Sequence, residues 1–171
     1  MSVDSRNADY MGAAGAPVDP EPISAEMEAL AADLIDYGLD ALAESAELAP
    51  TLVVEDASGE RTLLSLDGDE DIEECLDEAH DLIRSAARGK GATSGRAIEG
   101  LSERPVRYAI AYDGAIREEE GGPYRPALIV EYGERGLASG YSAYLLYKHA
   151  GQPQKFVWTD PAAAGEVELL V

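Results

Sequence analysis

One cysteine and two histidines are the side chains of this 171-residue chain best suited to nucleophilic or metal chemistry. Cys75 lies within an apolar stripe of helical spacing and is flanked by acids, so we expect a buried, unreactive thiol. His80 lies at the margin of that stripe, and His149 follows Lys148 after an apolar run. Because this set lacks the spacing of a triad or a zinc site, we predict no catalytic residue, metal or cofactor. Catalysis by a pair of carboxylates stays open as an alternative, since acids are abundant.

The stretch "DGDEDIEECLDE" has the acid spacing of a calcium-binding loop. Its positions 1, 3, 5 and 12 are Asp67, Asp69, Asp71 and Glu78. Position 6 is Ile72, whereas the sharp turn of an EF-hand requires glycine there. Ile72 also belongs to the apolar helical stripe that contains Cys75. We therefore predict the start of a helix with acids in its first turn.

The stretch "RSAARGKGATSGRA", residues 84–97, is basic and rich in glycine. A phosphate-binding loop requires G-x-x-x-x-G-K-[ST] between a strand and a helix, but here Gly91 follows Lys90 and the segment follows a helix. We predict that Gly89 ends this helix and that a connector follows. Contact with an anion or a partner through Lys90 and Arg96 is the alternative.

The net charge of −21 arises entirely in the first half of the chain. Residues 1–83 contain 23 acids and two arginines, whereas residues 84–171 contain 11 acids and 11 bases. We predict an acidic face on the second helix, made of Asp69, Glu70, Glu73, Glu74, Asp77, Glu78 and Asp81. It could serve solubility, dock a basic protein or mimic a nucleic-acid backbone. Direct nucleic-acid binding is disfavoured because phosphate contacts need a concentrated basic patch.

Seven of the nine tyrosines lie between residues 108 and 147. Alternation along strands places Tyr108 with Tyr112, and Tyr141 with Tyr147, on shared faces. Such tyrosines are typical of a half-buried sheet face, and they are also enriched at recognition surfaces. The predicted binding residues are Tyr108, Tyr112, Tyr141, Tyr147, Arg107, Lys148 and His149.

Periodicity predicts helices over about 23–48 and 70–88, with a hairpin of strands 51–56 and 61–66 between them. From Pro105 onward the period changes to two. This change predicts strands at 106–116, 126–132, 137–149, 155–159 and 166–171. The expected fold class is α+β, with two helices packed on one antiparallel sheet of five to seven strands. We expect a disordered N-terminal tail over residues 1–21 and a single domain over residues 22–171.

Composition and hydropathy bear on where in the cell the protein is expected to be found. No apolar run approaches the length of a membrane span, and the N-terminus has no apolar core of a secretory signal. A single cysteine excludes an intramolecular disulfide, so we expect a cytoplasmic protein.

At "LVVEDASGERTLLSL", "RYAIAYDG" and "ALIVEYGERG" the chain resembles a group of small uncharacterised bacterial α+β proteins. The resemblance covers about residues 30–149. It implies a leading helix, a hairpin, a second helix and a following strand, and it implies no catalytic residues and no function.

These observations favour a non-catalytic protein-binding module that uses the acidic half or the tyrosine-bearing sheet, with a basic protein as partner. A small-molecule binder or hydrolytic enzyme with a cleft between helix and sheet is the alternative. A homodimer formed through the edge of the C-terminal run "EVELLV" is a further hypothesis.

Overall fold

The computed structural model describes residues 21–67, 71–90 and 96–171. These residues form two helices and a seven-stranded antiparallel sheet, which confirms the predicted α+β class. The helices are α2 (Ala25–Ser45) and α3 (Ile72–Ala87). The strands are β1 (Thr51–Asp56), β2 (Arg61–Ser65), β3 (Pro105–Ile116), β4 (Arg125–Glu134), β5 (Gly140–Lys148), β6 (Val157–Trp158) and β7 (Ala162–Val167).

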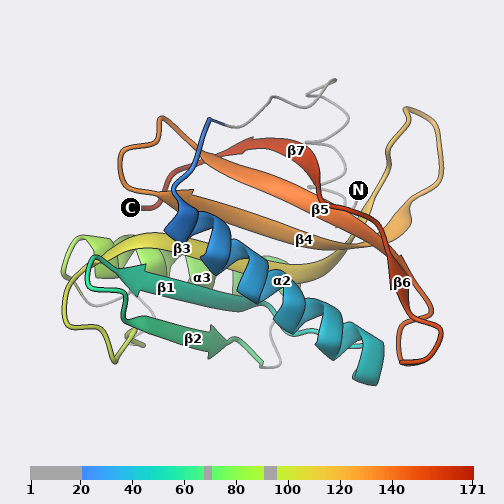
Figure 1. Cartoon of the computed structure of the whole chain (residues 1–171), viewed down its shortest axis with the longest axis horizontal. Helices are drawn as coiled ribbons and strands as arrows, with labels where there is room; N and C mark the ends of the chain where they lie inside the picture. The colour runs from blue at the N-terminus through green and yellow to red at the C-terminus, as the bar shows by residue number, and fades with distance from the viewer. Residues whose placement is uncertain (1–20, 68–70, 91–95) are drawn as a thin grey trace.

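The sheet has the order β2-β1-β3-β4-β5-β6, and β7 pairs with β5 beside β6. Figure 1 shows α2 in front of this sheet and α3 behind it. The two helices therefore cover opposite faces, and the molecule has three layers.

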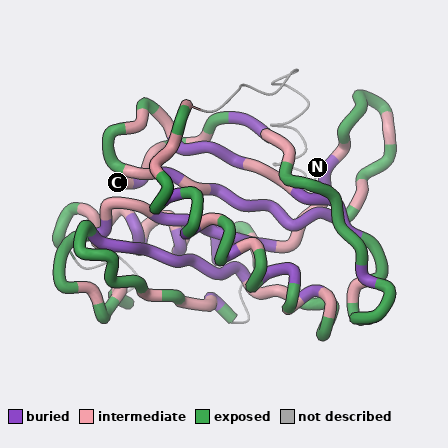
Figure 2. Tube along the Cα trace, viewed as in Figure 1, coloured by how far each residue is buried: buried purple, intermediate pink, exposed green. Residues whose placement is uncertain are grey.

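The central strands are buried on both faces because their side chains alternate between two cores (Figure 2). In β3, Ala109 and Ala111 face α2, whereas Tyr108, Ile110 and Tyr112 face α3. The small alanines lie under α2, and the large tyrosines fill the core under α3. Burial of both faces also explains why β1 is buried at every position.

Each helix begins at a side-chain cap. Ser24 Oγ accepts the Met27 N–H at 3.0 Å, and the Glu134 carboxylate in turn accepts hydrogen bonds from Ser24 N and Oγ. Asp71 caps α3 by accepting the Glu74 N–H at 2.9 Å. The cap role of Asp71 agrees with the predicted helix start and not with a calcium loop.

Helix α3 ends as predicted at a glycine. Gly89 has a φ of +72°, and its N–H donates to Ala86 O while Lys90 N–H donates to Ser85 O. These two bonds form a Schellman motif, in which a left-handed residue satisfies the last carbonyls of the helix. The rest of the predicted connector, residues 91–95, lies outside the described residues.

The boundaries of the fold differ from the predictions at both ends. Residues 1–20 of the predicted tail lie outside the described residues, but Glu21 is held in place, since its carboxylate accepts hydrogen bonds from Ala138 N and the Tyr141 hydroxyl. The last strand is not 166–171: β7 ends at Val167, and Leu170 is buried in the core under α3. Leu169, Leu170 and Val171 thus pack against the core under α3, and only the start of "EVELLV" belongs to the edge strand. Dimerisation through this run stays a prediction.

We expect Gly140→Ala to destabilise the fold. A Cβ at Gly140 would lie 2.7 Å from the Tyr108 hydroxyl oxygen and 2.9 Å from Glu168 O, so a neighbour must move. The free energy of unfolding, measured with urea, should fall by about 1–3 kcal/mol. Adding Tyr108→Phe should recover part of the loss in a double-mutant cycle, because it removes one clashing atom. Strict additivity of the two changes would contradict this packing.

Candidate functional site

The predicted tyrosine-bearing surface is not a surface in the structure. Tyr108 and Tyr112 are 0% and 1% exposed and belong to the core under α3. Burial raises the pKa of the Tyr108 phenol far above its usual value. Tyr147 lies in the opposite core, under α2, so the predicted tyrosines are divided between the two faces of the sheet. Strand periodicity had paired these residues correctly, but it could not show that helices cover both faces.

The hydroxyls of the other two predicted tyrosines, Tyr141 and Tyr147, form hydrogen bonds with carboxylates. Tyr141 donates to Glu21, and Tyr147 donates to Asp113 Oδ1 at 2.7 Å. Hydrogen bonding to Glu21 raises the pKa of Tyr141. Burial raises the pKa of both Tyr147 and Asp113. These hydrogen bonds tie both tyrosine hydroxyls to carboxylates of the same fold.

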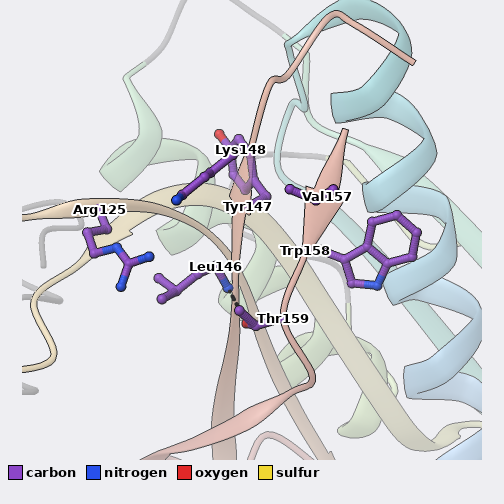
Figure 3. A pocket seen from close by; sticks show the side chains of 7 residues that line it. All are labelled: Arg125, Leu146, Tyr147, Lys148, Val157, Trp158 and Thr159. Atoms are coloured by element: carbon purple, nitrogen blue, oxygen red, sulfur yellow. Dashed lines mark hydrogen bonds between the residues drawn. The ribbon is translucent and has the colours of Figure 1, made fainter. Parts of the chain in front are cut away.

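Of the three predicted basic residues, Arg107 pairs with Glu55 inside the fold, whereas Lys148 and His149 are exposed. Lys148 and Tyr147 line a pocket of about 210 Å³ at the sheet edge formed by β6 (Figure 3). Arg125, Leu146, Val157, Trp158 and Thr159 complete its lining. The strand pattern gave no signal for Trp158, because its exposure depends on how β6 ends the sheet.

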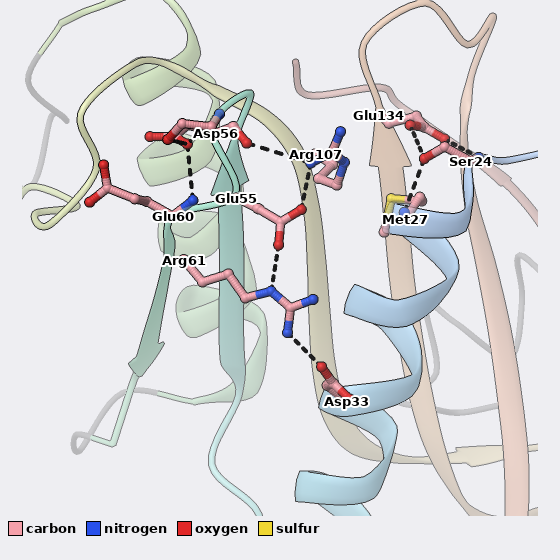
Figure 4. Close-up of polar contacts among 10 residues, drawn as sticks. Ser24, Met27, Asp33, Glu55, Asp56, Glu60, Arg61, Arg107 and Glu134 are labelled. Atoms are coloured by element: carbon pink, nitrogen blue, oxygen red, sulfur yellow. Dashed lines mark hydrogen bonds and ion pairs between the residues drawn. The ribbon is translucent and has the colours of Figure 1, made fainter.

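A buried carboxylate organises the end of the sheet nearest the start of α2 (Figure 4). Glu55 is 5% exposed and accepts hydrogen bonds from Arg107 Nη1 and Arg61 Nε. Arg61 also pairs with Asp33 of α2, and its hydrogen bonds to Glu55 and Asp33 raise the pKa of the guanidinium. The cluster therefore ties together β1, β2, β3 and α2, and its function is structural.

Asp56, the next residue, anchors the β1–β2 turn. Its Oδ1 accepts hydrogen bonds from the backbone and hydroxyl of Ser58 and from Glu60 N, and its Oδ2 accepts from Ser102 N and Glu103 N. The Ser58 hydroxyl and these backbone donors lower the pKa of the carboxyl to about 2.

The predicted acidic face on α3 is present in part. Asp69 and Glu70 lie outside the described residues, and Glu73, Glu74 and Asp77 are exposed. The remaining two have partners, since Glu78 pairs with Arg96 at 3.2 Å and Asp81 accepts a hydrogen bond from Ser85. Because α2 and α3 cover opposite faces, the described acids of these two helices lie on two separate surfaces.

The acids of α2 form a second surface, which the sequence analysis did not single out. Asp36, Asp40 and Glu44 recur every four residues and therefore share one exposed stripe of the helix. No cation pairs with these three carboxylates among residues 21–67, 71–90 and 96–171. The last turn of α2 contains no basic residue. Glu44 lies in this last turn, where its charge opposes the helix dipole, and like charges four residues apart repel each other, so the stripe raises the energy of α2.

A groove of about 530 Å³ separates this stripe from the segment that leads into β6. We call it the α2 groove. Asp36, Asp40 and Glu44 form its acidic wall, and it is completed by Leu39, Ala43, Pro153, Phe156 and Trp158.

Aromatic rings form the apolar side of the α2 groove. The Phe156 ring lies between Tyr147 and Trp158, at centroid distances of 5.8 and 5.6 Å. Phe156 is buried, whereas Trp158 is 55% exposed. The groove thus combines unpaired carboxylates with an accessible indole, which is the combination that binds cationic groups.

The cysteine and the histidines lie in different surroundings. A cavity of about 580 Å³ at the C-terminal end of α2 is lined by Cys75 and Asp113, but no histidine belongs to its lining. His80 Nε2 lies 2.9 Å from Glu131 Oε1, and His80 does not line this cavity. Among the described residues, no group of three or more metal-binding side chains is found. Within the same residues no helix has both the length and the apolarity to cross a membrane.

No family model matches the sequence, no curated protein is detectably similar to it, and no solved structure matches it. The resemblance to small uncharacterised bacterial proteins therefore stays a prediction.

The low pKa of Asp56 makes a testable contribution to stability. A carboxyl whose folded pKa is depressed stabilises the fold above its ordinary pKa of 3.8, and this contribution is lost as the pH falls toward about 2. We expect Asp56→Asn to lower the melting temperature at pH 7, and the gap to the wild type to shrink between about pH 4 and pH 2.

Thermal melts followed by circular dichroism across that range test this expectation. The exposed Asp160→Asn variant serves as the control and should follow the wild type throughout. A gap for Asp56→Asn that is independent of pH would contradict the assigned role.

Proposed function

We propose that this protein is a protein-binding module that recognises a basic segment of a partner through the α2 groove. The observation that carries the proposal is the acidic stripe of Asp36, Asp40 and Glu44, unpaired among the described residues and facing the exposed ring of Trp158. We also propose a cytoplasmic location, which the single buried cysteine supports.

Electrostatics favours a cationic occupant. Like charges four residues apart on a helix repel each other, by about 0.2–0.5 kcal/mol per pair. Acids at the C-terminal end of α2 add an unfavourable interaction with its dipole. A lysine or arginine in the groove relieves both terms, whereas a neutral or acidic occupant relieves neither.

The aromatic side of the groove favours a peptide over a free inorganic cation. Trp158 and Leu39 offer apolar contact to the methylene groups of a long basic side chain, and the indole face attracts its charged end. A hydrated metal ion would gain from the carboxylates alone. The geometry therefore suits arginine- or lysine-bearing segments of a protein.

The acidic residues of α3 are the weaker candidate surface. Glu78 is already paired with Arg96, and the acidic residues of the first turn of α3 are placed favourably with respect to its helix dipole. The negative charge of these α3 residues is therefore better compensated within the fold than the charge of the α2 stripe.

The test uses a nine-residue peptide of alternating arginine and leucine with blocked termini, titrated against the full chain. Trp158 is the only tryptophan, so its fluorescence reports occupancy of the groove directly. We expect D36N/D40N/E44Q to weaken binding about tenfold, since three exposed charge contacts of up to about 1 kcal/mol each are lost.

The matched control is E73Q/E74Q/D77N, which removes the same number of charges from α3. It should change the affinity by less than about twofold, apart from a general effect of net charge that falls with added salt. Equal losses in both triple variants, or unchanged affinity in Trp158→Ala measured by calorimetry, would overturn the proposal.

A further inference from the structure

The pocket on the other side of Trp158 differs from the α2 groove in charge. Its lining contains two cations, Arg125 and Lys148, and no carboxylate. The lining is therefore cationic in a chain that has 34 acids and 13 lysines and arginines. Figure 3 shows both basic side chains on the same side of the pocket, with the amine of Lys148 extended toward Arg125.

These cations retain capacity to bind a ligand. Lys148 has no ion-pair partner within the described parts of the chain. Arg125 pairs with Glu118 at 3.2 Å, but both side chains are more than two-fifths exposed, so the pair is weak and uses one of five guanidinium N–H groups. Glu118 does not line the pocket.

A hydroxyl adds a third donor. Thr159 Oγ1 accepts the Leu146 N–H at 2.9 Å, and Thr159 N–H donates to Leu146 O. Because the oxygen is used as an acceptor, its own hydrogen remains available, and no acceptor for it is found among the described residues. Arg125, Lys148 and Thr159 therefore offer donors to one small volume whose lining contains no acid, and Glu118 engages only part of the Arg125 guanidinium.

The rest of the lining is apolar or aromatic: Val157 and Trp158 are largely exposed, whereas Leu146 and Tyr147 are buried. The volume of about 210 Å³ equals that of about seven water molecules in the liquid. An inorganic anion would leave this apolar surface in contact with water, whereas a carboxylate with a short branched chain would cover it.

We infer that this pocket binds a small organic acid, a carboxylate attached to a short apolar group. The carboxylate lies against Arg125 and Lys148 and accepts the Thr159 hydroxyl, and the apolar group contacts Leu146 and Val157. This site is independent of the α2 groove, since the two share only Trp158.

The probe is 3-methylbutanoate, which has seven non-hydrogen atoms, titrated into the ¹⁵N-labelled full chain at about 0.15 M salt. We expect saturable shifts of the backbone amides of Lys148 and Thr159. The neutral amide of the same acid should give weaker binding, because it lacks the charge that the two cations attract. N-acetyl-leucine separates two sources of the same chemistry: tighter binding than that of the free acid indicates the C-terminus of a chain, and weaker binding indicates a free acid.

The variants are Lys148→Gln and Arg125→Gln, and each should weaken binding about fivefold, as expected for an exposed charge contact. Lys155→Gln is the control, because Lys155 is exposed nearby and lines neither cavity. D36N/D40N/E44Q should retain carboxylate binding, so failure of the α2 groove proposal is distinguishable from failure here. No saturable shift, equal binding of acid and amide, or an equal loss in Lys155→Gln would overturn the inference.

Discussion

Burial of the central strands on both faces is the constraint on which this structure depends. Strands β1, β3 and β4 expose apolar side chains to both sides, so each face must be covered by a separate helix. Between the helices the chain passes through the β1–β2 hairpin at one edge of the sheet, and α2 and α3 lie on opposite faces as a result (Figure 1). The same placement divides the acidic half of the sequence into two surfaces. A single acidic face is therefore incompatible with this core.

Packing against the sheet is also what allows α2 to carry its unfavourable charges. Met27, Leu30 and Leu42 are each 0% exposed, and burying side chains of this kind contributes about 1.5–3 kcal/mol apiece. Repulsion along the Asp36–Asp40–Glu44 stripe costs a few tenths of a kcal/mol per pair. The helix is stable in spite of its local electrostatics because tertiary burial outweighs them several-fold. The stripe therefore costs stability and forms no ion pair among the described residues, and the proposed recognition of a basic segment rests on this observation.

Both helices, the hairpin, the cap at Gly89 and the buried Cys75 could be predicted from the sequence, because each depends on local periodicity or on the conformation of one residue. The predictions that were wrong depend on how the helices and strands pack against one another. Tyr108 and Tyr112 alternate as surface tyrosines do, yet α3 covers them, and nothing local specifies which face a helix will choose. The last strand was placed too late because Leu170 is as apolar as a strand residue, although it packs into the core. Trp158 gave no signal, since a lone tryptophan in a short strand is more often buried.

Trp158 also explains how an acidic groove and a basic pocket can lie side by side without neutralising each other. It lines both cavities, and with Phe156 it forms an aromatic wall on the groove side. Lys148 and the α2 carboxylates are exposed, so a direct ion pair between them would gain at most about 1 kcal/mol. A rearrangement that broke the Phe156–Trp158 ring contact would offset that gain. Loss of an aromatic contact costs about as much. Among the described residues no ion pair joins Lys148 to the α2 carboxylates, and this is the condition that the two proposed binding sites of opposite sign require.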